Sequence, residues 1–141
     1  MTGKDVKALR LKIAVEDLCE ILSRLEERHG RLCDVLAAKE RALVEVAMDA
    51  IESCRSREDE ILREVIEEEK ERLLVTEEIG DLLDFDTPIS IRISDMLPHL
   101  DTDLASRLST RRECLRETAL RLQSQNRVNR ALIEHSLGHV Q

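Results

Sequence analysis

The chain has 141 residues, enough for one domain, with 37% charged residues, a net charge of −8 and one aromatic residue, Phe85. A compact globular core of this size normally uses several aromatic side chains, so the composition favours long helices packed through Leu, Ile, Val and Ala. The acidity disfavours binding to nucleic acids and to anionic membranes, and no apolar stretch approaches the length of a membrane span.

The first segment predicts a long helix over about residues 4–45, because apolar residues recur with a heptad period. The repeat consists of Leu11, Leu18, Leu25 and Leu32, with Val15, Leu22, His29 and Leu36 four positions later. Leu43 and Val46 extend this seam, and Lys39 is its one charged residue. The repeat keeps its phase through Gly30, so we expect this glycine inside the helix, at a cost of about 1 kcal/mol.

A second helix is predicted over about residues 49–79, after a corner near residues 45–50. The apolar stripe loses its phase after Val46 and restarts as Ile51, Cys54, Ile61, Leu62, Val65, Ile66 and Leu73. A phase break indicates either a stutter in one helix or a corner, and a monomer could not bury the seam of a single helix this long. We therefore expect a corner, with Asp49 capping the second helix and Gly80 closing it.

Residues 81–100 are predicted to form a linker, because both prolines of the chain fall within it. Asp84 to Pro88 has the composition of a turn. Ile89, Ile91 and Ile93 alternate with polar residues, which indicates an extended segment that lays alternate isoleucines on the bundle. A short helical turn is expected to start near Ser94 and Asp95.

The last helix is predicted over about residues 102–139, with Asp101 or Thr102 as its N-cap. Its stripe is Leu104, Leu108, Leu115, Ala119, Leu122, Asn126, Asn129, Ile133 and Val140. The fold class is therefore all-α. We expect an elongated antiparallel three-helix bundle, or coiled-coil-like hairpin, with an extended linker before the last long helix, in a single domain over residues 1–141.

The sequence contains no arrangement that is typical of catalysis or metal binding. Phosphate-binding glycine loops and nucleophile motifs are missing from it. His135 and His139 lie four residues apart, but two ligands make an incomplete metal site. Glu26 and His29 give one copy of a di-iron motif that requires two. We expect no enzymatic activity, no cofactor and no metal, and the scattered cysteines indicate reduced thiols in the cytoplasm.

Two asparagines, Asn126 and Asn129, occupy stripe positions where the rest of the helix would place leucine. They either fix the register of the bundle at a cost in stability, or mark a place where the bundle opens and meets another chain. In the second case a partner helix would bind this surface. The predicted partner-binding residues are Asn126, Asn129, Leu132, Ile133, Ser136, Leu137 and Val140.

The same segment resembles the late helix of the FlgN-type flagellar export chaperones. The residues that carry the resemblance are Asn126, Asn129, Leu132, Ile133, Glu134, Ser136 and Leu137. The first helix of the family resembles the N-terminal leucine heptads of this chain. Its second helix resembles residues 58–80, and its connector resembles residues 91–98. The resemblance therefore spans nearly the whole chain.

This resemblance implies a cytoplasmic chaperone of flagellar type III export. Such a chaperone binds helical terminal segments of hook–filament junction proteins, keeps them unassembled, and delivers them to the export gate. Binding in the family uses the late helix and a C-terminal tail. This chain ends at Gln141, soon after that helix, and has no tyrosine, so we expect the binding role rather than a tail-mediated gate contact to carry over. The alternatives are a structural coiled-coil protein that self-associates through its leucine seam, and a generic helical adaptor.

Overall fold

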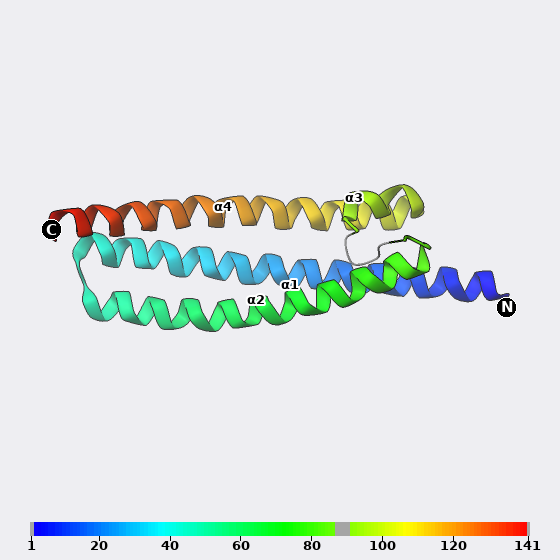
Figure 1. Ribbon diagram of the computed structural model, residues 1–141, viewed down its shortest axis with the longest axis horizontal. Coiled ribbons are helices and arrows are strands. Elements are labelled where there is room, and N and C mark those ends of the chain that lie inside the picture. The colour runs from blue at the N-terminus through cyan, green and yellow to red at the C-terminus, as the bar shows by residue number, and fades with distance from the viewer. Residues whose placement is uncertain (1, 87–90, 141) are drawn as a thin grey trace. The chain divides into compact units, whose positions relative to one another are not determined.

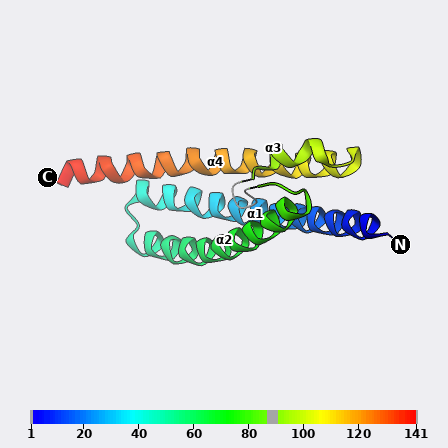
Figure 2. The ribbon, with the colours of Figure 1, turned by 45° about the vertical axis from the view of Figure 1, so that its right-hand side comes forward.

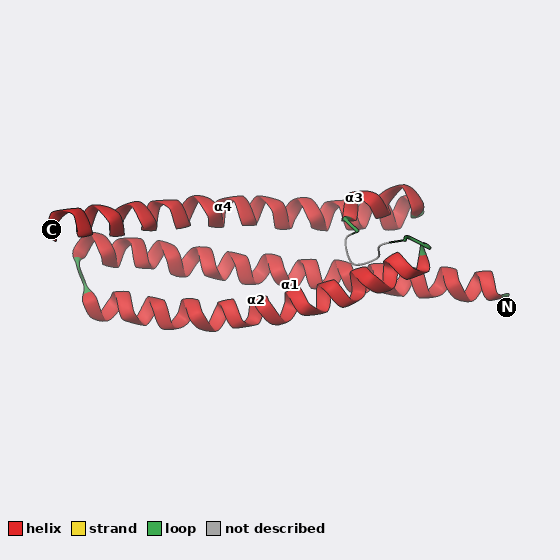
Figure 3. Cartoon of the chain, in the orientation of Figure 1, coloured by secondary structure: helices red, strands yellow, loops and turns green. Residues whose placement is uncertain are grey.

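The computed structural model describes residues 2–86 and 91–140, with the side chains of residues 136–140 left out of the description. Along the chain, its elements are α1 (Gly3–Glu45), α2 (Met48–Leu82), α3 (Ile93–Met96), the 3-10 helix η2 (Leu97–His99) and α4 (Thr102–Val140) (Figure 1). All regular elements of the described residues are helices (Figure 3), which confirms the predicted all-α class. No helix in this part of the chain is long and apolar enough to cross a membrane.

The packing divides the chain into two compact units. Unit 1 comprises Met1–Leu25 and Glu67–Leu115, and unit 2 comprises Glu26–Ile66 and Arg116–Gln141. Each of α1, α2 and α4 contributes a segment to both units, whereas α3 and η2 belong to unit 1. Within each unit, long helical segments pack side by side, as the heptad pattern predicts.

The core of unit 1 is built on the predicted seam of α1. Its fully buried side chains are Val15, Leu18 and Leu22 of α1, Ile79 of α2, Met96 of α3 and Leu108 of α4. Phe85 and His99, on either side of the linker, lie edge to face with ring centroids 5.2 Å apart. The one aromatic side chain of the protein therefore holds the end of α2 against η2.

The core of unit 2 continues the same seam. Leu32, Val35 and Leu36 of α1 pack against Cys54 and Ile61 of α2, and Ala38, Val65 and Leu122 border this cluster. In both views of the ribbon, the α1 segment of this unit lies between α2 and α4 (Figures 1 and 2). Gly30 is helical, as predicted, and a Cβ atom added to it would meet nothing within 4 Å.

Val46 and Ala47 make the corner between α1 and α2, inside the predicted window. The N–H of Val46 donates to the Leu43 carbonyl (3.3 Å), and that of Ala47 to the Ala42 carbonyl (2.9 Å). With Val46 in the left-handed region at φ 53°, these bonds form a Schellman motif. The extension of the seam to Val46 is wrong, because this residue lies beyond the helix and is 70% exposed.

Asp49 is not the cap of α2, contrary to the prediction. The first helical hydrogen bond runs from the N–H of Ile51 to the carbonyl of Ala47 (3.0 Å), so Ala47 stands at the N-cap. Asp49 lies in the first turn of α2 instead. Its carboxylate is favourable there because the amino end of a helix carries partial positive charge.

The prediction that Gly80 closes α2 is also wrong. The helix continues to Leu82, and Gly80 lies inside it. The left-handed residue is Asp84, at φ 59°. The N–H groups of Asp84 and Phe85 donate to the carbonyls of Asp81 (3.1 Å) and Gly80 (3.0 Å), which makes a second Schellman motif. An aspartate tolerates this conformation, so no glycine is needed.

The predicted stripe of α2 is correct in its first half only. Cys54 and Ile61 are buried, but Leu62, Ile66 and Leu73 are exposed. Thr76 and Ile79 are buried further along α2 instead. The side that faces the neighbouring helices thus runs through Ile61, half-buried Val65 and Thr76, and the apolar residues next to this row point to solvent.

The linker and the start of α4 follow the prediction closely. Arg92 begins a helical turn whose Asp95 carboxylate accepts the Arg92 N–H (2.9 Å), and the turn continues as η2 through Pro98. Ile91 and Ile93 are half-buried, whereas Ile89 lies outside the described residues. The Asp101 carboxylate accepts the N–H of Leu104 (2.9 Å), which confirms an N-cap at this position.

Candidate partner-binding surface

Asn129, the second asparagine of the late helix, is part of the packing between α4 and α1. Its side chain is 4% exposed. Its amide Nδ2 donates to the main-chain carbonyl of Leu36 (2.9 Å), and its Oδ1 accepts a hydrogen bond from Nε2 of Gln125 (3.1 Å). A buried amide satisfied in this way fits the first alternative for Asn129, in which it fixes the register of the two helices.

Gln125 extends this polar contact, and the sequence reasoning missed it. Its Nε2 also donates to Oε2 of Glu40 on α1 (2.9 Å). Leu122, Gln125, Asn129 and Leu132 follow one another at spacings of three, four and three residues, which is the inner row of a heptad helix. That spacing is the signal by which Gln125 could have been found.

The other predicted residues do not all share one environment. Asn126 is exposed, Leu132 is half-buried, and Ile133 is 39% exposed. The side chains of Ser136, Leu137 and Val140 lie outside the described part of the structure. Asn126 and Ile133 are seven residues apart and therefore lie on the same edge of α4, whereas Asn129 and Leu132 face inward. The stripe assignment of Asn126 and Ile133 to the core is wrong.

Further apolar side chains of α4 are also exposed. Leu120 and Val128 are exposed although neither was predicted to contribute to a binding site. Val128 is two residues from Asn126, about 200° around the helix, and therefore lies on the opposite edge of α4. We use the name late-helix surface for the exposed residues Leu120, Asn126 and Ile133 of α4. Because α4 uses a narrow inner row in this unit, much of its circumference stays open to another chain.

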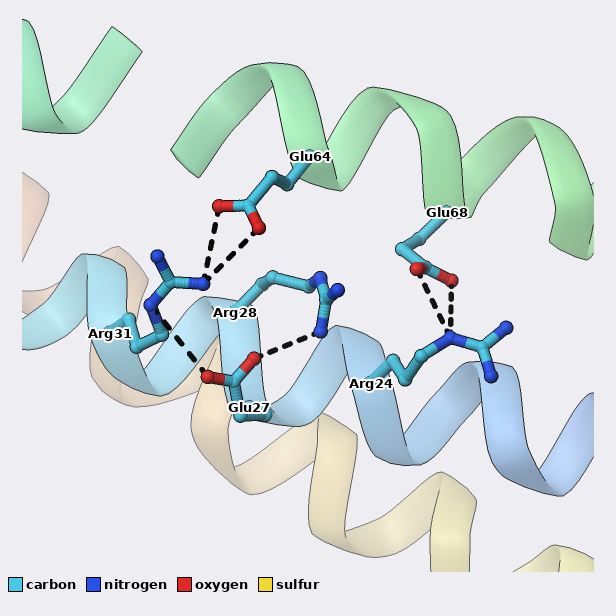
Figure 4. Close-up of polar contacts among 6 residues, drawn as sticks. All are labelled: Arg24, Glu27, Arg28, Arg31, Glu64 and Glu68. Carbon is cyan, nitrogen blue, oxygen red and sulfur yellow. Dashed lines mark hydrogen bonds and ion pairs between the residues drawn. The ribbon is translucent and has the colours of Figure 1, made fainter. Parts of the chain in front are cut away.

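The contact between α1 and α2 differs from the contact between α1 and α4, because several ion pairs border it. In unit 2, Nζ of Lys39 lies 3.1 Å from Oε1 of Glu58, with both side chains largely buried. Arg31 lies 3.2 Å from Oε2 of Glu64 (Figure 4). The charged residue in the predicted seam, Lys39, is therefore matched by an acid of α2 rather than left without a partner.

In unit 1, the corresponding contact is made by Arg24. Its Nε donates to both carboxylate oxygens of Glu68, at 3.1 and 3.0 Å (Figure 4), and its Nη2 donates to Glu71 at 3.1 Å. The hydrogen bond to Glu68 raises the pKa of the Arg24 guanidinium above its usual range. These groups are partly exposed, so their contribution to stability is modest.

The cysteine thiols offer little nucleophilic reactivity. Burial raises the pKa of Cys19 and of Cys33, and so favours the protonated thiol at neutral pH. Cys54 is buried in the core of unit 2. Within the described residues, no group of three or more His, Cys, Asp or Glu side chains is placed to hold a metal ion, and the side chain of His139 lies outside them.

Comparison with known proteins gives one match. The family model described as FlgN protein matches residues 13–141. No curated protein and no solved structure matches the chain. The matched range contains all of α2, α3 and α4, and all of α1 except its first turns.

Proposed function

The chain belongs to the FlgN family of flagellar type III export chaperones, and we propose that it binds hook–filament junction proteins in the cytoplasm before their export. The observation that carries this proposal is the family match over residues 13–141, which includes the whole late helix. The family is one of chaperones and not of enzymes. A chaperone role needs a surface for an unassembled partner rather than a catalytic pocket.

The proposed binding site is the late-helix surface, together with the predicted residues that follow it. The exposed Leu120 and Ile133 give apolar contact area, and Asn126 gives an amide that can pair with a partner's polar groups. A helical terminal segment of the partner would cover these side chains and complete the packing around α4. Covering the partner's own apolar face would prevent its premature assembly.

Co-purification tests this proposal. The full chain is co-expressed with each hook–filament junction protein of the same organism and recovered through a tag on the chain. We expect a stable complex with at least one of them. If none is retained by the wild-type chain, the proposed partner is wrong.

Two paired variants locate the site. Leu120→Asp with Ile133→Asp changes two side chains of the late-helix surface that are 54% and 39% exposed. The control, Leu62→Asp with Ile66→Asp, changes two of α2 that are 38% and 54% exposed in the same unit. We expect the first pair to abolish the complex and the control to preserve it, with unchanged helicity by circular dichroism. Equal loss in both pairs would place the binding elsewhere.

A structural role through self-association is the second candidate function. The exposed Leu62, Ile66 and Leu73 on α2 favour it, because unpaired apolar side chains on a helix promote association. Light scattering of the purified chain distinguishes the two roles. A stable oligomer that the Leu62→Asp, Ile66→Asp variant converts to monomer would support self-association through α2.

A further inference from the structure

A long stretch of α4, between Glu117 and Glu134, carries arginines and no acidic residue. Between Glu117 and Glu134 the sequence contains Arg121, Arg127 and Arg130, and this is the longest stretch of the chain without Asp or Glu. The chain as a whole has a net charge of −8. The positive charge is therefore local, and it lies on the helix that we propose as the binding site.

Three arginines line one edge of the helix. Arg116 and Arg130 are two heptads apart with Gln123 midway between them, so the three side chains share one row. Arg127 is one turn from both Gln123 and Arg130, which brings its side chain next to that row. All four side chains are exposed. We call Arg116, Arg127 and Arg130 the arginine row.

The arginine row is continuous with the late-helix surface. Asn126 lies one turn before Arg130 and Ile133 one turn after it, so their side chains neighbour its guanidinium group. Leu120 lies one turn after Arg116 and is exposed. A segment that covers the apolar side chains of the late-helix surface must therefore also pass along the arginines.

No acidic side chain pairs with the arginine row within the described residues. Two cations of α1 in the same unit, Arg31 and Lys39, are matched instead, because each has a glutamate of α2 within 3.2 Å. The acids of α2 thus pair with these cations of α1, and the guanidinium groups of Arg116, Arg127 and Arg130 on α4 are available to a ligand.

We propose that the arginine row selects a partner segment that is an acidic amphipathic helix, with carboxylates beside its apolar stripe. This inference rests on the proposed function, since it names the chemistry of the segment bound by the same surface. Guanidinium groups bind carboxylates through two parallel hydrogen bonds, a geometry that lysine cannot reproduce. Carboxylates two heptads apart on the partner would meet Arg116 and Arg130 while its apolar residues cover Leu120 and Ile133.

The charges of α2 support the same choice of ligand and of docking position. In unit 2 this helix carries six acidic residues against three arginines, so its formal charge is −3; the acids are Asp49, Glu52, Glu58, Asp59, Glu60 and Glu64. An acidic segment is repelled there and attracted by the arginine row of α4, so charge determines where on the unit it binds. Duplex DNA, the other polyanion that arginines attract, is disfavoured by the net charge of −8 of the whole chain.

Two designed peptides test the proposal on the full chain. They share one leucine stripe and differ only in the flanking residues, which are glutamates in one and lysines in the other. Fluorescence anisotropy gives both affinities at about 0.05 M and about 0.5 M salt, since exposed charges are screened at the higher concentration. We expect the glutamate peptide to bind at least about tenfold more tightly at low salt, and the difference to shrink at high salt.

Equal affinities, or no binding of either peptide, overturn the proposal. Tighter binding of a labelled DNA duplex than of the glutamate peptide also overturns it.

Charge variants assign the preference to the arginine row. The triple variant Arg116→Glu, Arg127→Glu, Arg130→Glu should reverse the preference, and the neutral triple variant with glutamine should remove it. The matched control reverses Arg55, Arg57 and Arg63 on α2, which are also exposed and change the net charge by the same amount. We expect the control to keep the wild-type preference. Equal effects of control and row variant would mean that net charge alone acts, which contradicts the proposal.

Co-purification with the junction proteins separates this inference from the proposed function. If a junction protein binds the wild-type chain and the glutamate row variant equally, the inference fails and the proposed function stands. If no junction protein binds, but the glutamate peptide shows a preference that depends on the row, the proposed function fails and the acidic-helix site stands.

Discussion

Val46 adopts a φ of 53° in the turn between α1 and α2. In that region the Cβ atom crowds the main chain, at a cost of about 1–2 kcal/mol for an ordinary residue, and a branched Cβ makes the crowding worse. The side chain gains little in return, because it is largely exposed. Glycine would adopt the same φ without strain.

We therefore expect Val46→Gly to stabilise the protein by about 1 kcal/mol, after subtraction of the larger conformational entropy of glycine in the unfolded chain. Urea denaturation followed by circular dichroism measures the change. Val44→Gly is the matched control, because Val44 is also exposed but lies within α1, where glycine should cost about 0.5 kcal/mol relative to valine. A loss of stability in both variants would show that Val46 is not strained.

At the scale of the element, α4 is held to α1 in unit 2 by polar as well as apolar groups. Leu122 borders the core cluster, and one turn further Gln125 reaches Glu40. Asn129 then bonds to the main chain of α1. Removal of the Asn129 amide would therefore break two hydrogen bonds at once, each of which contributes about 0.5–1.5 kcal/mol.

Asn129→Ala is expected to destabilise the protein by about 1–3 kcal/mol, because the carbonyl of Leu36 and the amide of Gln125 both lose a partner. Asn126→Ala provides the comparison, since Asn126 is exposed and should change stability by less than about 0.5 kcal/mol. Denaturant midpoints at constant m-value measure both. Similar losses in the two variants would contradict the inward placement of Asn129 alone.

The helices could be predicted from the sequence because the heptad repeat of α1 and the cap at Asp101 are local signals. The corner at Val46 could only be located to within a few residues, since no glycine or proline marks it and the left-handed residue is one that disfavours that conformation. Gly80 misled the prediction for the opposite reason: a glycine is tolerated inside a helix whose end is set by Asp84.

The place of Asn126 and Asn129 on the last helix could be predicted, but not which of them faces α1. Asn126 and Asn129 differ by three residues, and a small rotation of α4 decides which of them faces α1. That rotation depends on the hydrogen bonds of Gln125 and Asn129 with residues far away in the sequence. The exposure of Leu120 and Ile133 follows from the same rotation.

At the scale of the whole molecule, the three long helices each run through both units. A helix that unfolds in one unit loses hydrogen bonds at the boundary with the other, which couples the two. The single domain over residues 1–141 stays a prediction. It implies one cooperative transition, in which the cores of unit 1 and unit 2 open together.

Two buried thiols report on this cooperativity. Cys19 lies in the core of unit 1 and Cys54 in that of unit 2. In a background with the half-buried Cys33 and Cys114 changed to serine, a thiol reagent added along a urea series, with the labelled peptides identified by mass spectrometry, reads each unit separately. Ile61→Ala, in unit 2, should cost about 2–5 kcal/mol and expose both thiols at the same, lower urea concentration. Leu108→Ala, in unit 1, is the reciprocal control. Exposure of Cys54 before Cys19 in the Ile61→Ala variant would reveal two independently unfolding units.

The hydrogen bond from Asn129 ends on a main-chain carbonyl, and this has a consequence for how the protein can evolve. Every residue offers a main-chain carbonyl at position 36, and proline is excluded there only because it would break α1, so other substitutions need not be compensated at position 129. Residue pairs that change together across relatives would therefore not reveal this contact. The residue at position 129 would instead vary independently of the residue at position 36. It would depend only on whether the backbone of α4 lies close enough to α1 for this hydrogen bond to form.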